Sequence, residues 1–478
     1  MMSTPALLPT PVAAISHRGI RQRRGLSAVT MLTIYLVLLV GFPSNLAISA
    51  LGAYGRPQFL WGVVLFVWWA FSRLQTQRRP VEVVGQPVRV ALGVFLVIVL
   101  IGFAVALLRG QPADQVSPAI SAILRYVSWT GVVLVAIDGI RSMSDLLTIL
   151  RRIVIACSLL AMLGIVQFLT GQSFLEVFSG LPGFSESAGG IDTRGMFLRS
   201  SGTATHPLEY GTALSVAVPL ALAVAILRVA HRHESRRLRW WVFLAVLAVA
   251  SFLAVSRSTL IGFAVGVLFM IPALPRRYRA VIIVGGAILA AVVVVATPGL
   301  YGTVVGMFLG VGNDSSTQSR QAGLALAPVF LSAVPLLGVG AGTLLPRYFI
   351  FDNQWLGTLI ETGILGVLAF AAIFVVAVWS AASAARRAER DDTRLVGRAL
   401  AASTATAGLL LAFFDGLSFP IAAGLLFLLF GLCGAIRTIS WANAQEFQYA
   451  HWSSPAGSAS QDAVAGPVRA SSVVRSAA

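Results

Sequence analysis

The chain contains no lysine, only two cysteines and few charged residues of any kind. Charged side chains make up 11% of its 478 residues and hydrophobic ones 57%, which excludes an ordinary soluble protein. Cys157 and Cys433 both fall inside apolar runs, so we expect buried thiols rather than a disulfide, and no spacing suits zinc. The first ~25 residues lack a cleavable signal pattern. There is no internal repeat, which counts weakly against a transporter, since many secondary transporters carry one.

Long apolar runs, in contrast, fill the chain. Twelve of them are long enough to cross about 30 Å of hydrocarbon, with ends uncertain by several residues. They lie at about 27–44, 57–73, 88–108, 117–138, 153–170, 207–228, 239–255, 258–274, 279–297, 354–380, 398–415 and 418–437. The sequence therefore predicts an all-α integral membrane protein with about twelve transmembrane helices. The two runs around Arg257 could also form one re-entrant element.

All 35 basic residues are arginines, and their distribution predicts the orientation. With the N-terminus inside, 27 of them fall in cytoplasmic segments, as the positive-inside rule requires. Arg125 lies within a span, where we expect a buried carboxylate partner that the sequence does not identify. Both termini are therefore expected in the cytoplasm, and the net charge of +17 reflects orientation and anionic lipid rather than nucleic acid. The seven outer arginines are Arg56, Arg109, Arg194, Arg199, Arg257, Arg320 and Arg347.

Residues 27–437 are expected to form one polytopic membrane domain between two cytoplasmic tails. The tails, 1–26 and about 438–478, are rich in Ala, Ser, Pro and Arg, and the C-terminal one is expected to be flexible. Two outer connections, about 171–206 and about 298–353, are long, and loops of such length are usually functional or disordered.

The second long connection is expected to carry short helices, one of which the sequence locates. Ser315, Ser316 and Thr317 precede a mostly apolar run from Ala322 to Leu337, and Ser or Thr before such a run signals a helix N-cap. At about 16 residues, and broken by Pro328 and Pro335, this helix would lie on the outer surface instead of crossing the membrane.

Residues that can carry chemistry gather on the outer side in four clusters. Each also has an ordinary structural interpretation: His206-Pro207 as a helix start, Arg257 as a headgroup contact, Asp352-Asn353 as a helix cap. The glycine-rich run 338–342 resembles a phosphate loop but is better explained by a tight turn and close packing. Glu361, some seven residues into its span, is harder to explain structurally. The clusters are Arg199 to Gly211, Ser256-Arg257-Ser258, Arg320, and Leu337 to Gly366.

The guanidiniums of Arg199, Arg257 and Arg320 are predicted on the outer face of the membrane, where the positive-inside rule does not favour basic residues. A guanidinium fork binds phosphate through two hydrogen bonds and stays charged. Arginines at the outer headgroup level suit a lipid-linked diphosphate whose tail stays in the bilayer. A neighbouring histidine or carboxylate could deprotonate an incoming hydroxyl, a contribution worth about 10²–10⁴-fold in rate.

The order of these motifs resembles the bacterial O-antigen ligase/polymerase family over about residues 190–370. The matching motifs are Arg199-x-x-Gly-Thr-x-x-His206-Pro before one span, Ser-Arg257-Ser between two later spans, Arg320 ahead of Pro335-Leu-Leu-Gly-Val-Gly-x-Gly342, and Asn353 followed by Glu361-x-Gly-Ile-Leu-Gly366.

The resemblance implies a multi-pass glycosyltransferase of the GT-C type in the cytoplasmic (inner) membrane of a bacterium. It would polymerise or ligate undecaprenyl-diphosphate-linked oligosaccharide units at the outer face, in surface or exopolysaccharide biosynthesis, with no cofactor or metal. Its partners would be the lipid-linked glycan donor, a glycan or lipid acceptor, the bilayer and other polysaccharide assembly proteins. A twelve-span transporter or flippase of a lipid-linked or anionic substrate is the alternative.

The resemblance also implies roles for residues. Arg199, Arg257 and Arg320 would bind the diphosphate, and Glu361 would lie on the helix that closes the site. Where the family commonly shows His-Asn, this chain has Asp352-Asn353, so the catalytic base would be Asp352 or another group such as His206. Our catalytic candidates are therefore Asp352, His206 and Glu361, with Arg347 and Asn353 in support.

Overall fold

The computed structural model describes residues 27–75, 85–186, 192–194, 197–230, 237–310, 315–332 and 334–452, and these are mostly helical. The predicted tail 1–26 and the end of the other, 453–478, lie outside the described residues. The helices are α1 (Ala28–Val40), α2 (Pro57–Gln75), α3 (Pro87–Leu108), α4 (Ala113–Gly139), α5 (Met143–Thr170), α6 (Glu176–Ser179), α7 (Pro207–Ala230), α8 (Arg237–Leu253), α9 (Arg257–Met270), α10 (Arg276–Ala296), α11 (Leu300–Leu309), α12 (Ser315–Ser332), α13 (Gln354–Arg387), α14 (Asp391–Leu410) and α15 (Pro420–Trp452).

Each of the twelve predicted apolar runs lies in a helix, which confirms an all-α membrane protein. Among the described helices, seven are long and apolar enough to cross a membrane: α3, α4, α5, α7, α10, α13 and α15. Four more apolar helices, α1, α8, α9 and α11, are shorter. The number of twelve spans and the orientation of the termini therefore stay predictions.

The centre of the bundle is α7, whose residues Pro207–Leu227 are almost entirely buried. Its side chains are mainly Ala, Val and Leu, and such small residues let neighbouring helices approach closely. Helices α5, α8, α9, α14 and α15 pack around it. Because α7 begins at Pro207, this core helix fixes the position of the His206 motif.

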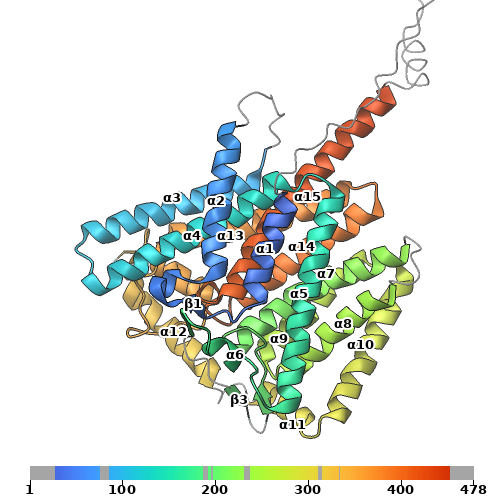
Figure 1. Cartoon of the computed structure of the whole chain (residues 1–478), viewed down its shortest axis with the longest axis horizontal. Coiled ribbons are helices and arrows are strands. Elements are labelled where there is room, and N and C mark those ends of the chain that lie inside the picture. Colours follow the sequence, from blue (N-terminus) through green and yellow to red (C-terminus); the bar gives the residue numbers. More distant parts are fainter. Residues whose placement is uncertain are drawn as a thin grey trace, which may run out of the picture.

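One end of the bundle collects the short elements of the two long connections. In Figure 1, α6, α11, α12 and the strands lie at the end opposite to the one from which α15 projects. Strand β1 (Leu46–Ile48) pairs antiparallel with β2 (Phe184–Glu186), and β3 (Asp192–Arg194) with β4 (Phe197–Arg199). The first connection of the chain is thus joined to the connection that carries Arg199.

Helix α13 is broken at Gly363, and the glycine-rich run fills the break. Gly363 has φ +69° and ψ −172°, so its neighbours lose helical partners. The amides of Val339 and Gly340 donate to the carbonyls of Ile360 and Glu361 at 3.0 and 2.9 Å. A broken helix at membrane depth is tolerated where protein supplies such replacement hydrogen bonds. The run 338–342 therefore acts in close packing, as expected.

One expectation about element limits was wrong. Helix α12 begins at Ser315 and continues through Pro328 to Ser332, so this proline does not break it. The long connection also contains α11, so within the described residues it carries short helices, as expected. Helix α15 continues to Trp452, past the end of the apolar run at about 437, because backbone hydrogen bonding can carry a helix on into polar sequence.

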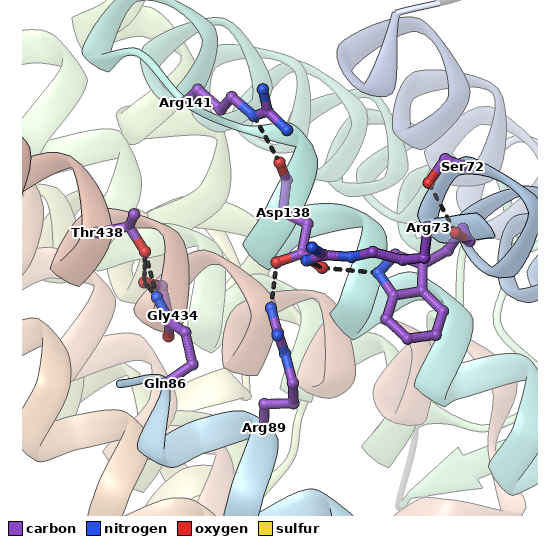
Figure 2. A network of polar contacts seen from close by, with 9 residues as sticks. Ser72, Arg73, Gln86, Arg89, Asp138, Arg141, Gly434 and Thr438 are labelled. Atoms are coloured by element: carbon purple, nitrogen blue, oxygen red, sulfur yellow. Dashed lines mark hydrogen bonds and ion pairs between the residues drawn. The ribbon is translucent and has the colours of Figure 1, made fainter. Parts of the chain in front are cut away.

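Asp138 ties three helices together at the other end of the bundle (Figure 2). Its carboxylate accepts a hydrogen bond from the Trp69 indole at 2.7 Å and forms ion pairs with Arg73 and Arg89. These partners belong to α2 and α3, and Asp138 itself lies at the end of α4. The network anchors the end of the bundle that is rich in arginine.

Candidate functional site

A cavity of 270 Å³ at the end with the short elements brings together five of the eight residues singled out in the sequence: Arg199, His206, Arg257, Arg320 and Asp352. They come from β4, the start of α7, the start of α9, the first half of α12 and the segment before α13. We call this space the arginine cavity. Residues more than 150 positions apart in the chain meet here.

Four helices begin at the arginine cavity, which makes its electrostatic field more positive. Its lining includes residues from or beside the first turns of α7, α9 and α12, and Asp352 immediately precedes the N-cap of α13. Each helix start contributes about half a positive charge. Three arginines face one aspartate in the lining. The cavity is therefore suited to an anion, and to one of more than a single charge.

Arg257 is held in place from two sides. Its Nη1 donates to the carbonyl of Met307 at 3.0 Å, and its Nη2 lies 3.5 Å from the Thr317 hydroxyl. Just before it, the buried Val255 has φ +46°, a left-handed conformation that is rare for a β-branched residue and costs about 1–3 kcal/mol. Such strain persists only where the surrounding structure fixes it, which is typical of functional sites.

Arg320 reaches the cavity from α12. Its guanidinium carbon lies 5.6 Å from the ring centre of Phe413, a cation–π contact that orients the side chain. Phe413 also lines the cavity, together with the apolar side chains of Leu208, Ile261 and Phe308. The lining of the cavity is thus partly apolar, and Arg320 lies over one of its aromatic rings.

The loop between Arg199 and His206 is fixed by the side chain of Gln167 on α5. Its Oε1 accepts a hydrogen bond from the Gly202 amide at 2.7 Å, and its Nε2 donates to the Gly202 carbonyl at 3.0 Å. Gly202 has φ +60°, and a Cβ here would come within 2.5 Å of Leu160. Only glycine fits this position, which explains its place in the motif.

Glu209 positions the same loop, and reasoning from the sequence did not assign it a role. Its buried carboxylate accepts hydrogen bonds from the amides of Thr205 and Ile421, at 2.9 and 2.6 Å, and from the Ser44 hydroxyl at 2.9 Å. It thereby joins the starts of α7 and α15 to the first connection. An acid in the first turn of an otherwise apolar span was the available signal.

His206 is both a helix cap and a cavity residue. Its Nδ1 accepts a hydrogen bond from the Leu208 amide at 3.1 Å. Because Nδ1 accepts, the neutral ring carries its proton on Nε2, and that nitrogen acts as a donor. In this arrangement His206 offers a donor to the cavity. Asp352, the other group considered for the base, lines the same cavity.

The remaining three residues lie elsewhere. Glu361 lines a separate cavity. Asn353 accepts a hydrogen bond from the Leu356 amide at 3.2 Å and caps α13, as its ordinary interpretation holds. Arg347 is exposed and forms an ion pair with Asp114 of α4. The side chain of neither Asn353 nor Arg347 lines the arginine cavity. Among the described residues, no group of three His, Cys, Asp or Glu could hold a metal ion.

Comparison with known proteins points to a family through the second half of this site. A search of the curated proteins finds no match to the chain. Residues 242–371 match the model of a protein family, the O-antigen ligases. That segment contains Arg257, Arg320 and Asp352, while Arg199 and His206 precede it. The match supports the assignment to the O-antigen ligase/polymerase family that the sequence motifs suggested.

Proposed function

We propose that the chain is a membrane glycosyltransferase, which moves a glycan from undecaprenyl diphosphate to an acceptor hydroxyl at the outer face of the cytoplasmic membrane. The observation that carries this proposal is the convergence of three arginines and four helix starts on one cavity with a partly apolar lining. The match to the O-antigen ligase model and the apolar helices support a membrane protein of polysaccharide assembly, for which such a site would bind the lipid-linked substrate.

The diphosphate is the leaving group of the proposed reaction. The acceptor oxygen forms a bond to the anomeric carbon, the bond from that carbon to the diphosphate oxygen breaks, and its electron pair stays on the diphosphate. Arg199, Arg257 and Arg320 stabilise the negative charge that develops there. The side chains of Leu208, Ile261, Phe308 and Phe413 offer an apolar surface to the first units of the lipid.

Asp352 is the base of the proposed reaction. Its carboxylate takes the proton of the acceptor hydroxyl as the new bond forms. His206, with its proton on Nε2, donates a hydrogen bond to the diphosphate. Asp352 thus takes the part that a histidine commonly has at this position in the family that the sequence resembles.

Arginine substitutions test the proposal. Purified protein in nanodiscs is given an undecaprenyl-diphosphate-linked oligosaccharide, and the product is separated by size. Arg257→Ala and Arg320→Ala should each lower transfer about 10–100-fold, because a hydrogen bond to a charged group contributes about 1.5–3 kcal/mol. Arg→Lys at both positions should give an intermediate loss, since lysine keeps the charge but not the fork.

The matched control is Arg109→Ala, an exposed arginine at the end of α3 that lines neither the arginine cavity nor the cavity that contains Glu361. This variant should transfer as the wild type does. Undiminished transfer by both Arg257→Ala and Arg320→Ala would overturn the proposal. Movement of the lipid-linked oligosaccharide across a vesicle, with no new glycosidic bond, would instead support the transporter.

A further inference from the structure

A second cavity, of 200 Å³, lies beside the first and shares no lining residue with it. It is enclosed by α4, α13, residues 344–351 and the loop between α14 and α15. The exposed residues Pro346, Ile350 and Ser418 line its mouth. We call it the carboxylate cavity, because it is lined by Glu361 and Asp415.

The acidic groups of this cavity are already hydrogen-bonded in part: the Glu361 carboxylate accepts from the amides of Gly342 and Leu344, and Asp415 is hydrogen-bonded with Ser418. Arg125 of α4 and Glu361 of α13 both line it and interact electrostatically. Within the described part of the chain, however, neither side chain takes part in an ion pair shorter than 4 Å. Arg125 and its expected carboxylate partner thus line one cavity without a direct ion pair, and a carboxylate has about four acceptor sites, so both groups keep hydrogen-bonding capacity for a ligand.

The charge and the aromatic content of the lining select the class of ligand. The carboxylate cavity is lined by two acidic side chains and one arginine, whereas the arginine cavity is lined by three arginines and one aspartate. A phosphate is therefore disfavoured here. Tyr126 and Trp129 present ring surface, and carboxylates with a guanidinium accept from and donate to hydroxyl groups. A neutral ligand rich in hydroxyls, such as a sugar ring, matches this lining.

The size and rigidity of the cavity agree with a single sugar ring. Its volume is below the roughly 300–1,000 Å³ of pockets for drug-sized ligands. Gln354 fixes its walls, because its Oε1 accepts from the Leu417 amide at 2.8 Å and its Nε2 donates to the Thr358 hydroxyl at 3.1 Å. The loop that carries Asp415 is thereby tied to α13. The cavity is formed before any ligand binds.

The two cavities meet at the start of α13. Phe351 lines the carboxylate cavity, and the next residue, Asp352, lines the arginine cavity. The charge of Asp352 also acts on Asp415 across this boundary. A sugar in the carboxylate cavity would therefore lie next to the base that the proposed function assigns to Asp352.

We propose that the carboxylate cavity binds the sugar of the acceptor and presents its hydroxyl to Asp352. This inference rests on the proposed function, since it supplies the second substrate of the same reaction. Glu361 and Asp415 act here as acceptors for sugar hydroxyls. The role expected for Glu361 thereby changes from catalysis to binding.

Gly357 offers a direct test. It lies on α13 in the lining of the carboxylate cavity, and a Cβ at this position would meet no atom within 4 Å. Gly357→Phe therefore fills the cavity without a backbone clash. Gly286→Phe on α10 is the matched control, because it is exposed, has equally open surroundings and lines neither cavity. Each protein is assayed for transfer from the lipid-linked oligosaccharide and, separately, for binding of undecaprenyl diphosphate.

Gly357→Phe should lower transfer more than tenfold while its affinity for undecaprenyl diphosphate stays within twofold of the wild type. Glu361→Gln and Asp415→Asn, which keep the volume, should raise the KM for the acceptor and leave diphosphate binding unchanged. Transfer at the wild-type rate by Gly357→Phe, or unchanged acceptor KM in both polar variants, would overturn the inference. A wild-type protein that neither binds undecaprenyl diphosphate nor transfers would instead overturn the proposed function.

Discussion

At the scale of the single residue, Asp415 shows how the surroundings of a carboxyl group change its pKa. It lies in the loop between α14 and α15, outside the membrane-spanning helices. Burial raises the pKa of its carboxyl to about 6, a hydrogen bond with Ser418 opposes this, and the charge of Asp352 adds to the increase. Glu361, whose carboxylate lines the same cavity, and Arg125 are the other charged groups that face it. The ionised form of Asp415 is therefore disfavoured in the folded protein.

A pH dependence of stability follows from this shift. The folded pKa lies above the ordinary value of 3.8 for an aspartate, so the folded protein holds the proton more tightly and loses stability as pH rises from about 4 to about 6. Above pH 6, Asp415→Asn should be more stable than the wild type by about 1–3 kcal/mol, since one pKa unit corresponds to about 1.4 kcal/mol. Thermal unfolding midpoints in detergent at several pH values measure this, and identical profiles for both proteins would contradict it.

Residue types and their order predicted much of the site, because the positive-inside rule makes an outer arginine conspicuous. Arg199, Arg257, Arg320, His206 and Asp352 do share a cavity. Glu361 could not be placed in this way, since its depth along a helix does not say which cavity its side chain lines. Glu209 was not recognised as a positioning residue for the same reason: its partners, Ser44 and the Ile421 amide, lie far away in the sequence.

At the scale of the element, the apolar runs predicted the helices because hydrophobic length is a local property of sequence. The pairing of β1 with β2 and the packing of Pro335–Gly340 into the break of α13 were not predicted. Both depend on backbone hydrogen bonds between distant segments, and the pattern of apolar residues along the sequence does not predict such bonds. Gly363, at the break, was noted as part of a motif without its conformation being foreseen.

Two glycines of α13, six positions apart, allow the effect of a substitution at the helix break to be compared with its effect at an ordinary helical position. Gly363→Ala places a Cβ within 2.3 Å of the Leu336 backbone and demands φ +69° of an alanine, so it should destabilise the protein by about 2–5 kcal/mol. Gly357→Ala has open space and ordinary helical geometry, and should be neutral or stabilising by up to about 1 kcal/mol. Unfolding midpoints of the two variants compare these effects. Equal midpoints would mean that the break is not required.

At the scale of the whole molecule, the two cavities lie at one end of the bundle, and the ion-pair network of Asp138 lies at the other. Helix α4 reaches both ends: Asp114 pairs with Arg347 near the carboxylate cavity, and Asp138 pairs with Arg73 and Arg89. The two aspartates are 24 positions apart, which is about 36 Å along a helix at 1.5 Å per residue. Loss of the distant network should therefore affect stability without altering the charges around the substrates.

Asp138→Asn tests this separation. The change removes two ion pairs and leaves Arg73 and Arg89 beside a neutral amide, so the free energy of unfolding should fall by about 1–3 kcal/mol. Below the unfolding midpoint, binding of undecaprenyl diphosphate and the rate of transfer should match the wild type, because the network contributes no residue to either cavity. Glu209→Gln is the informative contrast, since it weakens the hydrogen bonds that hold the His206 loop and should lower both stability and transfer. A loss of transfer by folded Asp138→Asn equal to that of Glu209→Gln would show that the two ends are coupled, which the positions of these residues do not predict.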